Sequence, residues 1–393
     1  MSSSDSAGRP AGDCPLQLVP LGEQEYLAWI DTSLCKSRGG IGPRQCPSWG
    51  RSQNGWVSEV VGWKTPGGRL VGAALVLSRS LPRLRERFCY IPDGPNIAWT
   101  TPYPDRWLSP LVDHLATNGA FAIRMSPPLR RSLWQARTVQ EATRSRTPRK
   151  LGDITPDAID PIGSTVTDYL ITQGWTLVID DTSPHYTIQL PLVNRSIHSL
   201  WSNLDRQWKG SIEYAQEAGL ESFQGGVIDL SGLRRLMLAA EEHHGLSPDL
   251  SFFSLRRLYH GMNAERAGRM RLFLAQYHGK ILAAHFLAFI GDQAWYLHGA
   301  TNSRRSLYPG HALQWQMICH SLTRGASAYH AQRVPGTLDI HAGDNSVLRR
   351  NLGLGGHVVE PLGHWQLILN QRLYRAFRLC RSGEYKKLLR ADI

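Results

Sequence analysis

Hydrophobic and polar positions follow regular periods along most of the first half of the chain, and these periods predict its helices and strands. Alternating or continuous apolar runs bounded by turn residues predict strands at 56–63, 70–78, 87–91 and 120–125. Helical spacing predicts helices at 24–33 and 107–118, whereas the Gly-, Pro- and Ser-rich residues 37–55 are expected to be loop. Thr65-Pro66-Gly67-Gly68 separates the first two strands, which indicates a hairpin.

The second half repeats this order of elements. Strands are predicted at 176–179, 186–190, 270–277, 281–290 and 293–299, near 328, and at the start of 365–378. Helices are predicted at 197–218, 233–243, 251–267, 310–324, near 345–351, and at the basic end of 365–378. Each half is thus a meander of strands followed by a helix and a further strand, which favours an α+β pair of similar domains.

The domain boundary is expected in the connector 148–161, which holds three prolines and three aspartates. Residues 1–13 are polar and small and are predicted to be disordered. The first domain is expected to span 14–155 and to be completed by 358–393, and the second to span 160–357.

Composition indicates a soluble globular protein. The 393 residues are 42% hydrophobic and 19% charged, with a mean hydropathy of −0.29. The longest apolar run, Ile281 to Ile290, is interrupted by His285 and is shorter than the ~20 residues that a bilayer span needs, so we expect a buried strand. The polar start has no secretory pattern. We therefore expect a cytoplasmic monomer with no integral membrane contact.

The sequence contains no motif that indicates a metal or cofactor site. The six cysteines form no C-x-x-C pair, and the fifteen histidines include no H-E-x-x-H motif. We expect free thiols, no metal site and no cofactor.

The charge balance points to a polyanionic partner. Lys and Arg number 44 against 32 Asp and Glu, a net charge of +12, which suits nucleic acid, phosphates or an anionic membrane. One segment concentrates cations against the single acid Glu141: Arg130, Arg131, Arg137, Arg144, Arg146, Arg149 and Lys150. This segment predicts a surface that follows phosphates, and an ordinary solvated loop is the alternative.

Five short segments occur in a common order. Tyr90-Ile-Pro-Asp-Gly-Pro95 precedes Gly174-Trp175, and the helix 199–219 follows with a tryptophan near its start, a basic turn and a terminal glycine. Tyr296-Leu-His-Gly-Ala300 and Leu348-Arg-Arg-Asn-Leu-Gly353 come next. In this order the chain resembles the FemABX family over about residues 40 to 370.

The resemblance implies a fold and a reaction. It implies two tandem domains of acetyltransferase-like (GNAT-like) fold with a cleft between them, and no coiled-coil arm. It also implies transfer of an aminoacyl group from aminoacyl-tRNA to an amine. Because the aminoacyl ester is already activated, such an enzyme mainly aligns the amine, stabilises the oxyanion and needs no cofactor.

Candidate site residues follow from this resemblance and from residue chemistry. Arg349 stands where the family has a lysine and is the first catalytic candidate, and Asp93 and His330 are candidate proton acceptors. Candidates for substrate binding are Arg51, Tyr90, Trp208, Lys209, Tyr214, Tyr296 and His298. Candidates for tRNA binding are Arg130, Arg131, Arg144, Arg146, Arg149, Lys150 and Arg350. Core packing remains open for the aromatic residues and histidines, and a solvated helix face for Arg349 and Arg350.

Departures from the family pattern concern the acceptor. Trp208 stands at a polar position, Asp93 replaces an arginine, and Tyr329-His-Ala-Gln332 replaces an aspartate-glycine block. We therefore expect Ala or Gly to be transferred to a small amine on an antibiotic scaffold of the peptidyl-nucleoside or streptothricin kind. A peptidoglycan-precursor acceptor is the alternative.

Two further readings stay open. Arg350-Asn-Leu-Gly-Leu-Gly355 fits the R-x-x-G-x-G pattern of an acetyl-CoA pyrophosphate loop, but a predicted helix precedes it where such a loop needs a strand. A non-catalytic nucleic-acid-binding protein would use the same cations without a cleft.

Overall fold

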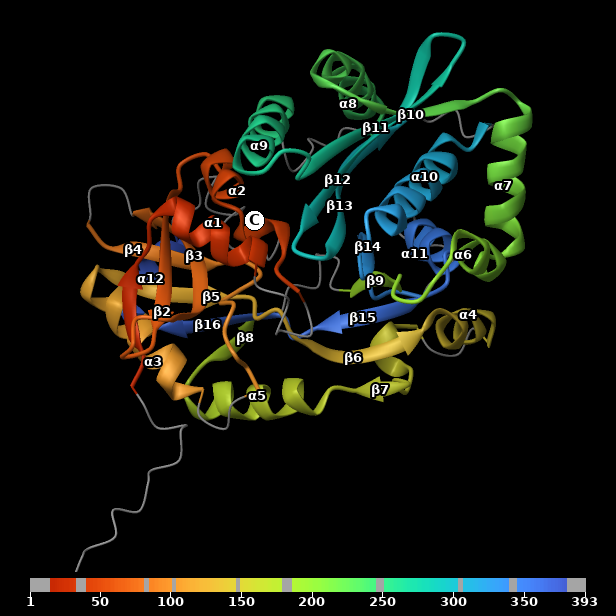
Figure 1. The fold of residues 1–393 in the computed structure, drawn as a ribbon. Coiled ribbons are helices and arrows are strands. Elements are labelled where there is room, and N and C mark those ends of the chain that lie inside the picture. Colours follow the sequence, from red (N-terminus) through yellow and green to blue (C-terminus); the bar gives the residue numbers. More distant parts are fainter. Residues whose placement is uncertain are drawn as a thin grey trace, which may run out of the picture.

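The computed structural model of the protein describes residues 15–32, 40–80, 85–100, 104–145, 149–178, 186–244, 251–302, 307–338 and 345–379. The predicted disorder of residues 1–13 and the candidate Arg146 lie outside this part of the chain. Figure 1 shows two sheets side by side, with β16 (His364–Ile368) and β15 (His357–Pro361) lying in line across the junction between them.

The first sheet is built on the predicted meander. Its strands β1 (Gln17–Pro20), β2 (Val57–Lys64), β3 (Leu70–Ser80) and β4 (Arg87–Ile91) pair antiparallel. Helix α3 (Asp105–Thr117) then crosses over, and β5 (Ala120–Met125) pairs parallel with β4. The predicted hairpin, crossover helix and return strand are therefore confirmed.

The second sheet repeats the unit. Strands β10 (Glu221–Gly225), β11 (Met270–Tyr277), β12 (Lys280–Ile290) and β13 (Gln293–Thr301) pair antiparallel. Helix α10 (Pro309–Thr323) crosses over, and β14 (Ala328–Val334) pairs parallel with β13. The apolar run 281–290 is a buried strand, as predicted from its being too short to span a bilayer.

Short strands complete both sheets, and some of them join the sheet of the other half of the sequence. In the described residues, β6 (Arg130–Gln135), β7 (Ala158–Ile159), β9 (Tyr186–Pro191) and β15 complete the nine-stranded second sheet. Strands β8 (Thr176–Val178) and β16 complete the seven-stranded first sheet. The sheets therefore do not follow the expected boundary at 155–160, because the chain crosses between the halves repeatedly.

The remaining helices cover the sheets in three hydrophobic clusters. Helices α1 (Glu23–Thr32), α2 (Pro47–Ser52), α8 (Leu230–His244), α9 (Phe252–Glu265) and α12 (Gln371–Leu379) contribute to a middle cluster shared by both halves. Helices α4 (Ala136–Ser145), α6 (Ile197–Asn203), α7 (Arg206–Glu217), α10 and α11 (Asn345–Leu352) pack in the cluster of the second half. Helices α3 and α5 (Pro161–Thr172) pack in the cluster of the first.

Two sequence predictions are wrong. The helix expected at 197–218 is broken into α6 and α7, because Asp205 leaves the helix and its side chain accepts a hydrogen bond from the Trp208 backbone N–H at 2.7 Å. The loop expected over 37–55 contains α2, whose Trp49 packs into the shared cluster with 6% exposure. Proline at the first turn starts this helix.

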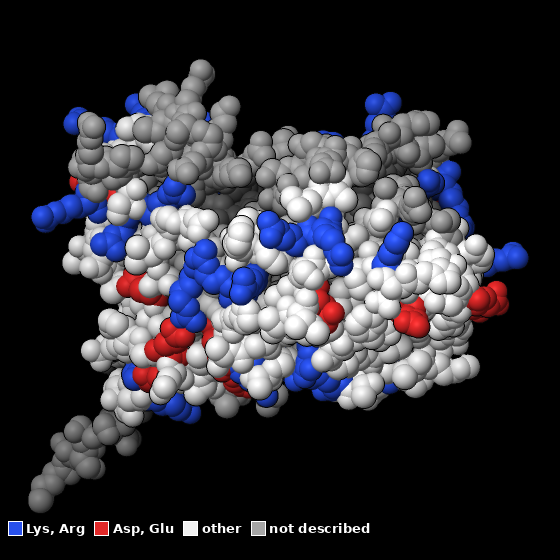
Figure 2. All heavy atoms as spheres, turned by 90° about the horizontal axis from the view of Figure 1, so that it is seen from above, with Lys and Arg blue, Asp and Glu red and all other residues white. Residues whose placement is uncertain are grey.

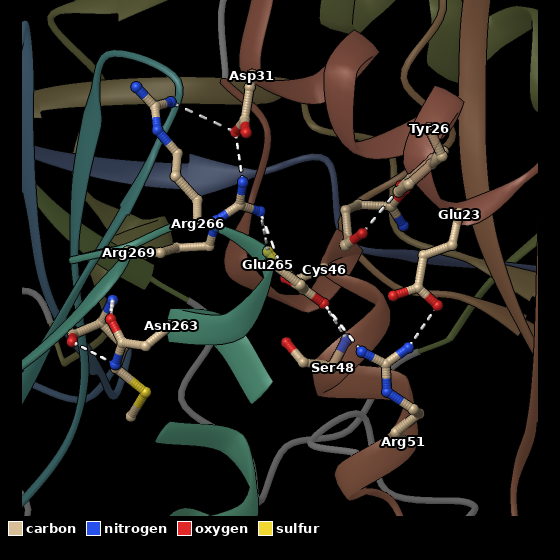
Figure 3. Close-up of polar contacts among 12 residues, drawn as sticks. Glu23, Tyr26, Asp31, Cys46, Ser48, Arg51, Asn263, Glu265, Arg266 and Arg269 are labelled. Atoms are coloured by element: carbon tan, nitrogen blue, oxygen red, sulfur yellow. Dashed lines mark hydrogen bonds and ion pairs between the residues drawn. The ribbon is translucent and has the colours of Figure 1, made fainter. Parts of the chain in front are cut away.

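Charged residues also tie the halves together (Figure 3). Arg269, whose side chain is fully buried, bonds Asp31 of α1 at 2.5 Å and lies 3.4 Å from Glu265 of α9. Arg51 of α2 pairs with Glu23 at 2.6 Å and with Glu265 at 3.4 Å. The junction therefore consists of a shared apolar core and an ion-pair network.

Candidate functional site

A cavity of about 270 Å³ opens between the two sheets. The first half contributes the chain just beyond the ends of β4 and β5, including Asp93 and Ser126. The second half contributes strands β9, β13, β14 and β15, including Trp295 and His330. The cavity lies at the junction of two domains, which is a preferred place for small-molecule sites.

Asp93 is held in the cavity wall by three features. Its backbone has φ 47°, an uncommon conformation that Asp and Asn tolerate better than most residues. Its backbone N–H donates to Ser126 Oγ at 2.8 Å, and its carboxylate pairs with Arg44 Nη2 at 2.7 Å. The carboxylate is thus fixed in direction and can accept a hydrogen bond from a bound amine.

His330 of β14 also lines the cavity. Its ring stacks on Trp295 with centroids 3.6 Å apart, and its Nε2 lies 2.8 Å from Gln293 Oε1. Burial lowers the pKa of His330 to about 3, although Asp93 and Asp292 act in the other direction. A neutral imidazole with so low a pKa is a weak proton acceptor and is better suited to orienting a substrate.

Among the charged residues that line the cavity, arginines outnumber acids by four to two. It contains the acids Asp93 and Glu360 and the arginines Arg44, Arg130, Arg131 and Arg333. Arg130 bonds Asp160 at 3.0 Å. The predicted residues Asp93, His330, Arg130 and Arg131 therefore meet in one place, and the surplus of arginine favours an anionic ligand.

A second polar cluster lies inside the second half around Arg350. Burial is the main cause that lowers the pKa of His285 to about 3 and of His311 to about 4, and the Arg350 guanidinium adds to both shifts. Burial raises the pKa of Tyr296 to about 12. Arg350 donates to Gln332 at 3.2 Å and has no ion-pair partner among the described side chains.

The other predicted residues lie apart from the cavity. Arg349 is exposed on α11, and Tyr214 is exposed beside Tyr308. Tyr90 and Trp208 are each 1% exposed in hydrophobic clusters, which is the core packing that the sequence left open. The remaining three are Arg51 in the junction network, Lys209 bonded to the Ser202 carbonyl at 3.0 Å, and half-buried His298.

The basic segment begins at the cavity. Arg130 and Arg131 begin β6 and line the cavity, and α4 follows directly. Arg137 pairs with Glu141 on the exposed face of α4 at 2.8 Å. Further along, the exposed cations are Arg144, Arg149 and Lys150.

Sequence reasoning missed several cavity residues. Arg44 lies in the segment expected to be loop. Its ion pair with Asp93 joins residues far apart in the sequence, and no local pattern predicts it. Arg333 lies three residues after His330 on β14. Its position on the same strand as a candidate residue could have marked it as a further candidate.

The geometry also bears on metal binding, membrane spanning and the glycine motif. No group of three or more His, Cys, Asp or Glu within the described residues is placed to hold a metal ion. No described helix is long and apolar enough to cross a bilayer. Gly353 and Gly355 follow α11 and lead into β15, so the order is helix then strand, opposite to that of a pyrophosphate loop.

Comparison with solved structures defines the class. The crystal structure of FemX superposes with a TM-score of 0.72 at 17% identity, covering 92% of this chain and 99% of that one. A tandem GNAT protein from the clavulanic acid biosynthesis pathway gives 0.51 at 13% identity, covering 90% and 99%. A GNAT acetyltransferase-domain model also matches residues 206–337. The protein is thus a tandem GNAT-like α+β protein, as predicted.

The sequence matches narrow the class to a family. The FemAB family model matches residues 44–254, which is 211 of 393 residues. The chain belongs to the FemAB family.

Curated relatives match over a shorter stretch. Aminoacyltransferase FemA of Staphylococcus epidermidis is 27% identical over 108 residues, which are 27% of this chain and 26% of that protein. The lipid II:glycine glycyltransferase of Staphylococcus haemolyticus is 28% identical over 113 residues, or 28% and 27% of the two chains. The aligned part therefore spans about a quarter of each relative.

Proposed function

We propose that the protein is an aminoacyltransferase that moves an aminoacyl group from aminoacyl-tRNA to an amine in the cavity between its two sheets. The observation that carries this proposal is the basic cavity itself, in which Asp93 and four arginines from both halves converge. Membership of the FemAB family and the names of the relatives, which are aminoacyltransferases, support it.

The reaction requires little chemistry from the protein. The acceptor nitrogen attacks the ester carbonyl, a C–N bond forms, the C–O bond to the ribose breaks, and the proton lost from nitrogen ends on the ribose oxygen. The Asp93 carboxylate, directed by Arg44, accepts a hydrogen bond from the amine and orients it. The cavity arginines hold phosphates and stabilise the developing oxyanion.

The described cations give the donor a path to the cavity. Arg130 and Arg131 line it, and Arg144, Arg149 and Lys150 are exposed near the end of α4 and beyond it. Phosphates of a 3′ strand can follow these side chains, with an affinity that falls as salt rises. The exposed Arg349 is available to the same strand at the end of α11.

The acceptor we propose is a small amine of an antibiotic scaffold, with alanine or glycine as the transferred residue. The departures at Asp93 and His330, both in the cavity wall, support an acceptor different from that of the typical family member. A peptidoglycan precursor is the second candidate, because one relative is named for glycyl transfer to lipid II.

A donor comparison tests the function. The purified chain is incubated with alanyl-tRNA, glycyl-tRNA or acetyl-CoA, each with a streptothricin-type amine or a nucleotide-linked cell-wall precursor, and products are identified by mass spectrometry. We expect an aminoacylated product that disappears after ribonuclease treatment of the donor. A product formed from acetyl-CoA and unaffected by ribonuclease would overturn the proposal.

A matched pair of variants tests the site. Asp93→Asn keeps the side-chain size and tolerates the positive φ, so we expect the fold to be kept. Because the variant removes the negative charge that orients the amine, we expect turnover to fall at least tenfold. Asp113→Asn, on the exposed face of α3, is the control and should leave turnover unchanged. Equal turnover in the two variants would contradict the role of Asp93.

A further inference from the structure

Helices α8 and α9 present one exposed face that combines arginine with large apolar side chains. Its members are exposed at helical spacing on each helix: Arg234, Arg235 and Leu238 on α8, and Phe253, Arg256 and Arg257 on α9. The Arg234 guanidinium lies 5.9 Å from the Phe253 ring, so the two stripes adjoin. We call these six residues, with Ile228 just before α8, the α8–α9 face.

The apolar members of this face are unusually exposed. Ile228 is 86% exposed, Phe253 64% and Leu238 46%. Leu238 and Phe253 have buried neighbours on the same helix, such as Leu233 and Leu255, which are 0% exposed. The helices thus already bury one apolar side against the sheet, and a second set of apolar groups faces water.

The arginines of this face have no carboxylate partners among the side chains that the structure describes. No ion pair joins Arg234, Arg235, Arg256 or Arg257 to a described carboxylate, and Arg257 donates only to the Arg51 carbonyl at 3.2 Å. Figure 2 looks down on the side of the molecule where α8 and α9 lie in Figure 1. A band of Lys and Arg crosses the middle of that side, and most of the visible Asp and Glu lie to one side of the band.

The proposed transfer reaction does not use this face. None of its residues lines the cavity between the sheets, and the shallow hollow formed by Phe253, Arg256, Arg257 and His260 is a separate feature of α9. The charge and the exposed apolar groups therefore need a different explanation.

We propose that the α8–α9 face docks on the surface of an anionic lipid bilayer. Four arginines complement the negative headgroups, and each raises the affinity for such a surface about fivefold. Phe253, Ile228 and Leu238 enter the boundary between headgroups and acyl chains, which is how amphipathic interfacial helices bind. An RNA backbone would satisfy the arginines but would give the aliphatic side chains no partner, so the bilayer fits better. The inference concerns where the protein works and does not depend on the transfer reaction.

Vesicle sedimentation of the full chain tests this inference. The protein is mixed with vesicles of phosphatidylcholine alone or of phosphatidylcholine with phosphatidylglycerol, and the bound fraction is measured at low and high salt. We expect binding to the anionic vesicles only, weakened by salt. Arg256→Gln/Arg257→Gln should lower the partition coefficient about 30-fold, since each arginine contributes about fivefold, and Phe253→Ser should also lower it.

The controls separate docking from general charge and from RNA binding. Arg69→Gln/Arg206→Gln removes two exposed arginines elsewhere and should bind vesicles almost as well as the wild type. Circular dichroism and the melting temperature check that all variants are folded. Equal loss in both double variants would overturn the inference, as would wild-type binding that is absent or independent of phosphatidylglycerol. Loss of tRNA affinity with unchanged vesicle binding in Arg256→Gln/Arg257→Gln would assign the face to RNA and overturn it too.

Discussion

Removal of the Asp31 carboxylate should destabilise the junction between the halves strongly. Arg269 is fully buried and its shortest ion pair, at 2.5 Å, is with Asp31. Its other contacts are longer: 3.4 Å to Glu265 and 3.5 Å to Cys46 Sγ. Because burial raises the pKa of the Glu265 carboxyl, that group is a weaker substitute for Asp31.

The size of the effect follows from the burial of Arg269. Breaking a buried ion pair from one side leaves an uncompensated charge and costs about 3–5 kcal/mol. We expect Asp31→Ala to cost about 3 kcal/mol, since Glu265 compensates in part. Arg266, which is 53% exposed and 3.5 Å from Asp31, contributes much less, and Arg266→Gln should cost under about 1 kcal/mol.

Urea unfolding measured by circular dichroism provides the assay, in the form of a double-mutant cycle. Asp31→Ala/Arg269→Met should be more stable than Asp31→Ala alone, because no buried charge is left without a partner. If Asp31→Ala costs less than Arg266→Gln, or if the cycle gives no coupling between Asp31 and Arg269, the reasoning is refuted.

Three further predictions concern the site. Arg350→Gln should reduce both stability and turnover because Arg350 lies among buried side chains, whereas Arg349→Gln should reduce turnover only. The melting temperature and kcat of both variants test this difference. Equal effects in the two variants would contradict the structural role of Arg350 and the exposed position of Arg349. Burial lowers the pKa of His330 to about 3 against roughly 6.5 in the unfolded chain, so the unfolded state binds more protons between these values and stability falls as pH drops through that window. His330→Gln should therefore lose roughly 2 kcal/mol less than the wild type between pH 7 and 4.5 in urea unfolding, and an unchanged loss would show that His330 does not carry this sensitivity. The exposed cations proposed to bind tRNA phosphates are Arg144, Arg149 and Lys150. Changing any one of them to Gln should lower the slope of log tRNA affinity against log salt concentration by about 0.7–0.9. A filter-binding titration that shows an unchanged slope would mean that the residue does not contact the tRNA.

The sequence predicted the repeated meander because local patterns decide it. Strands such as 70–80 and 87–91 are largely apolar runs bounded by turns, and each pairs with the strands that precede and follow it along the chain. The short strands β6 and β8 are different. Their pairing with the opposite half depends on contacts between distant segments, which periodicity does not record.

The candidate site was predictable in part. The sequence predicts Asp93 and His330 as proton acceptors because of their side-chain chemistry, and the fold brings both to the cavity. Arg349 and Arg350 show the limit of this reasoning, since adjacent helix positions point about 100° apart and only packing reveals which one is half-buried. Arg44 could not be found because its role depends on a loop that carries no periodic pattern.

We propose above that aminoacyl transfer takes place in the cavity between the two sheets. A crystal structure with a stable amide analogue of an aminoacylated adenosine terminus tests it most directly. We expect the aminoacyl carbonyl to lie in the cavity, within reach of Asp93, with phosphates near Arg130 and Arg131. An analogue bound on the far side of the second sheet around Arg350, with the cavity empty, would contradict it.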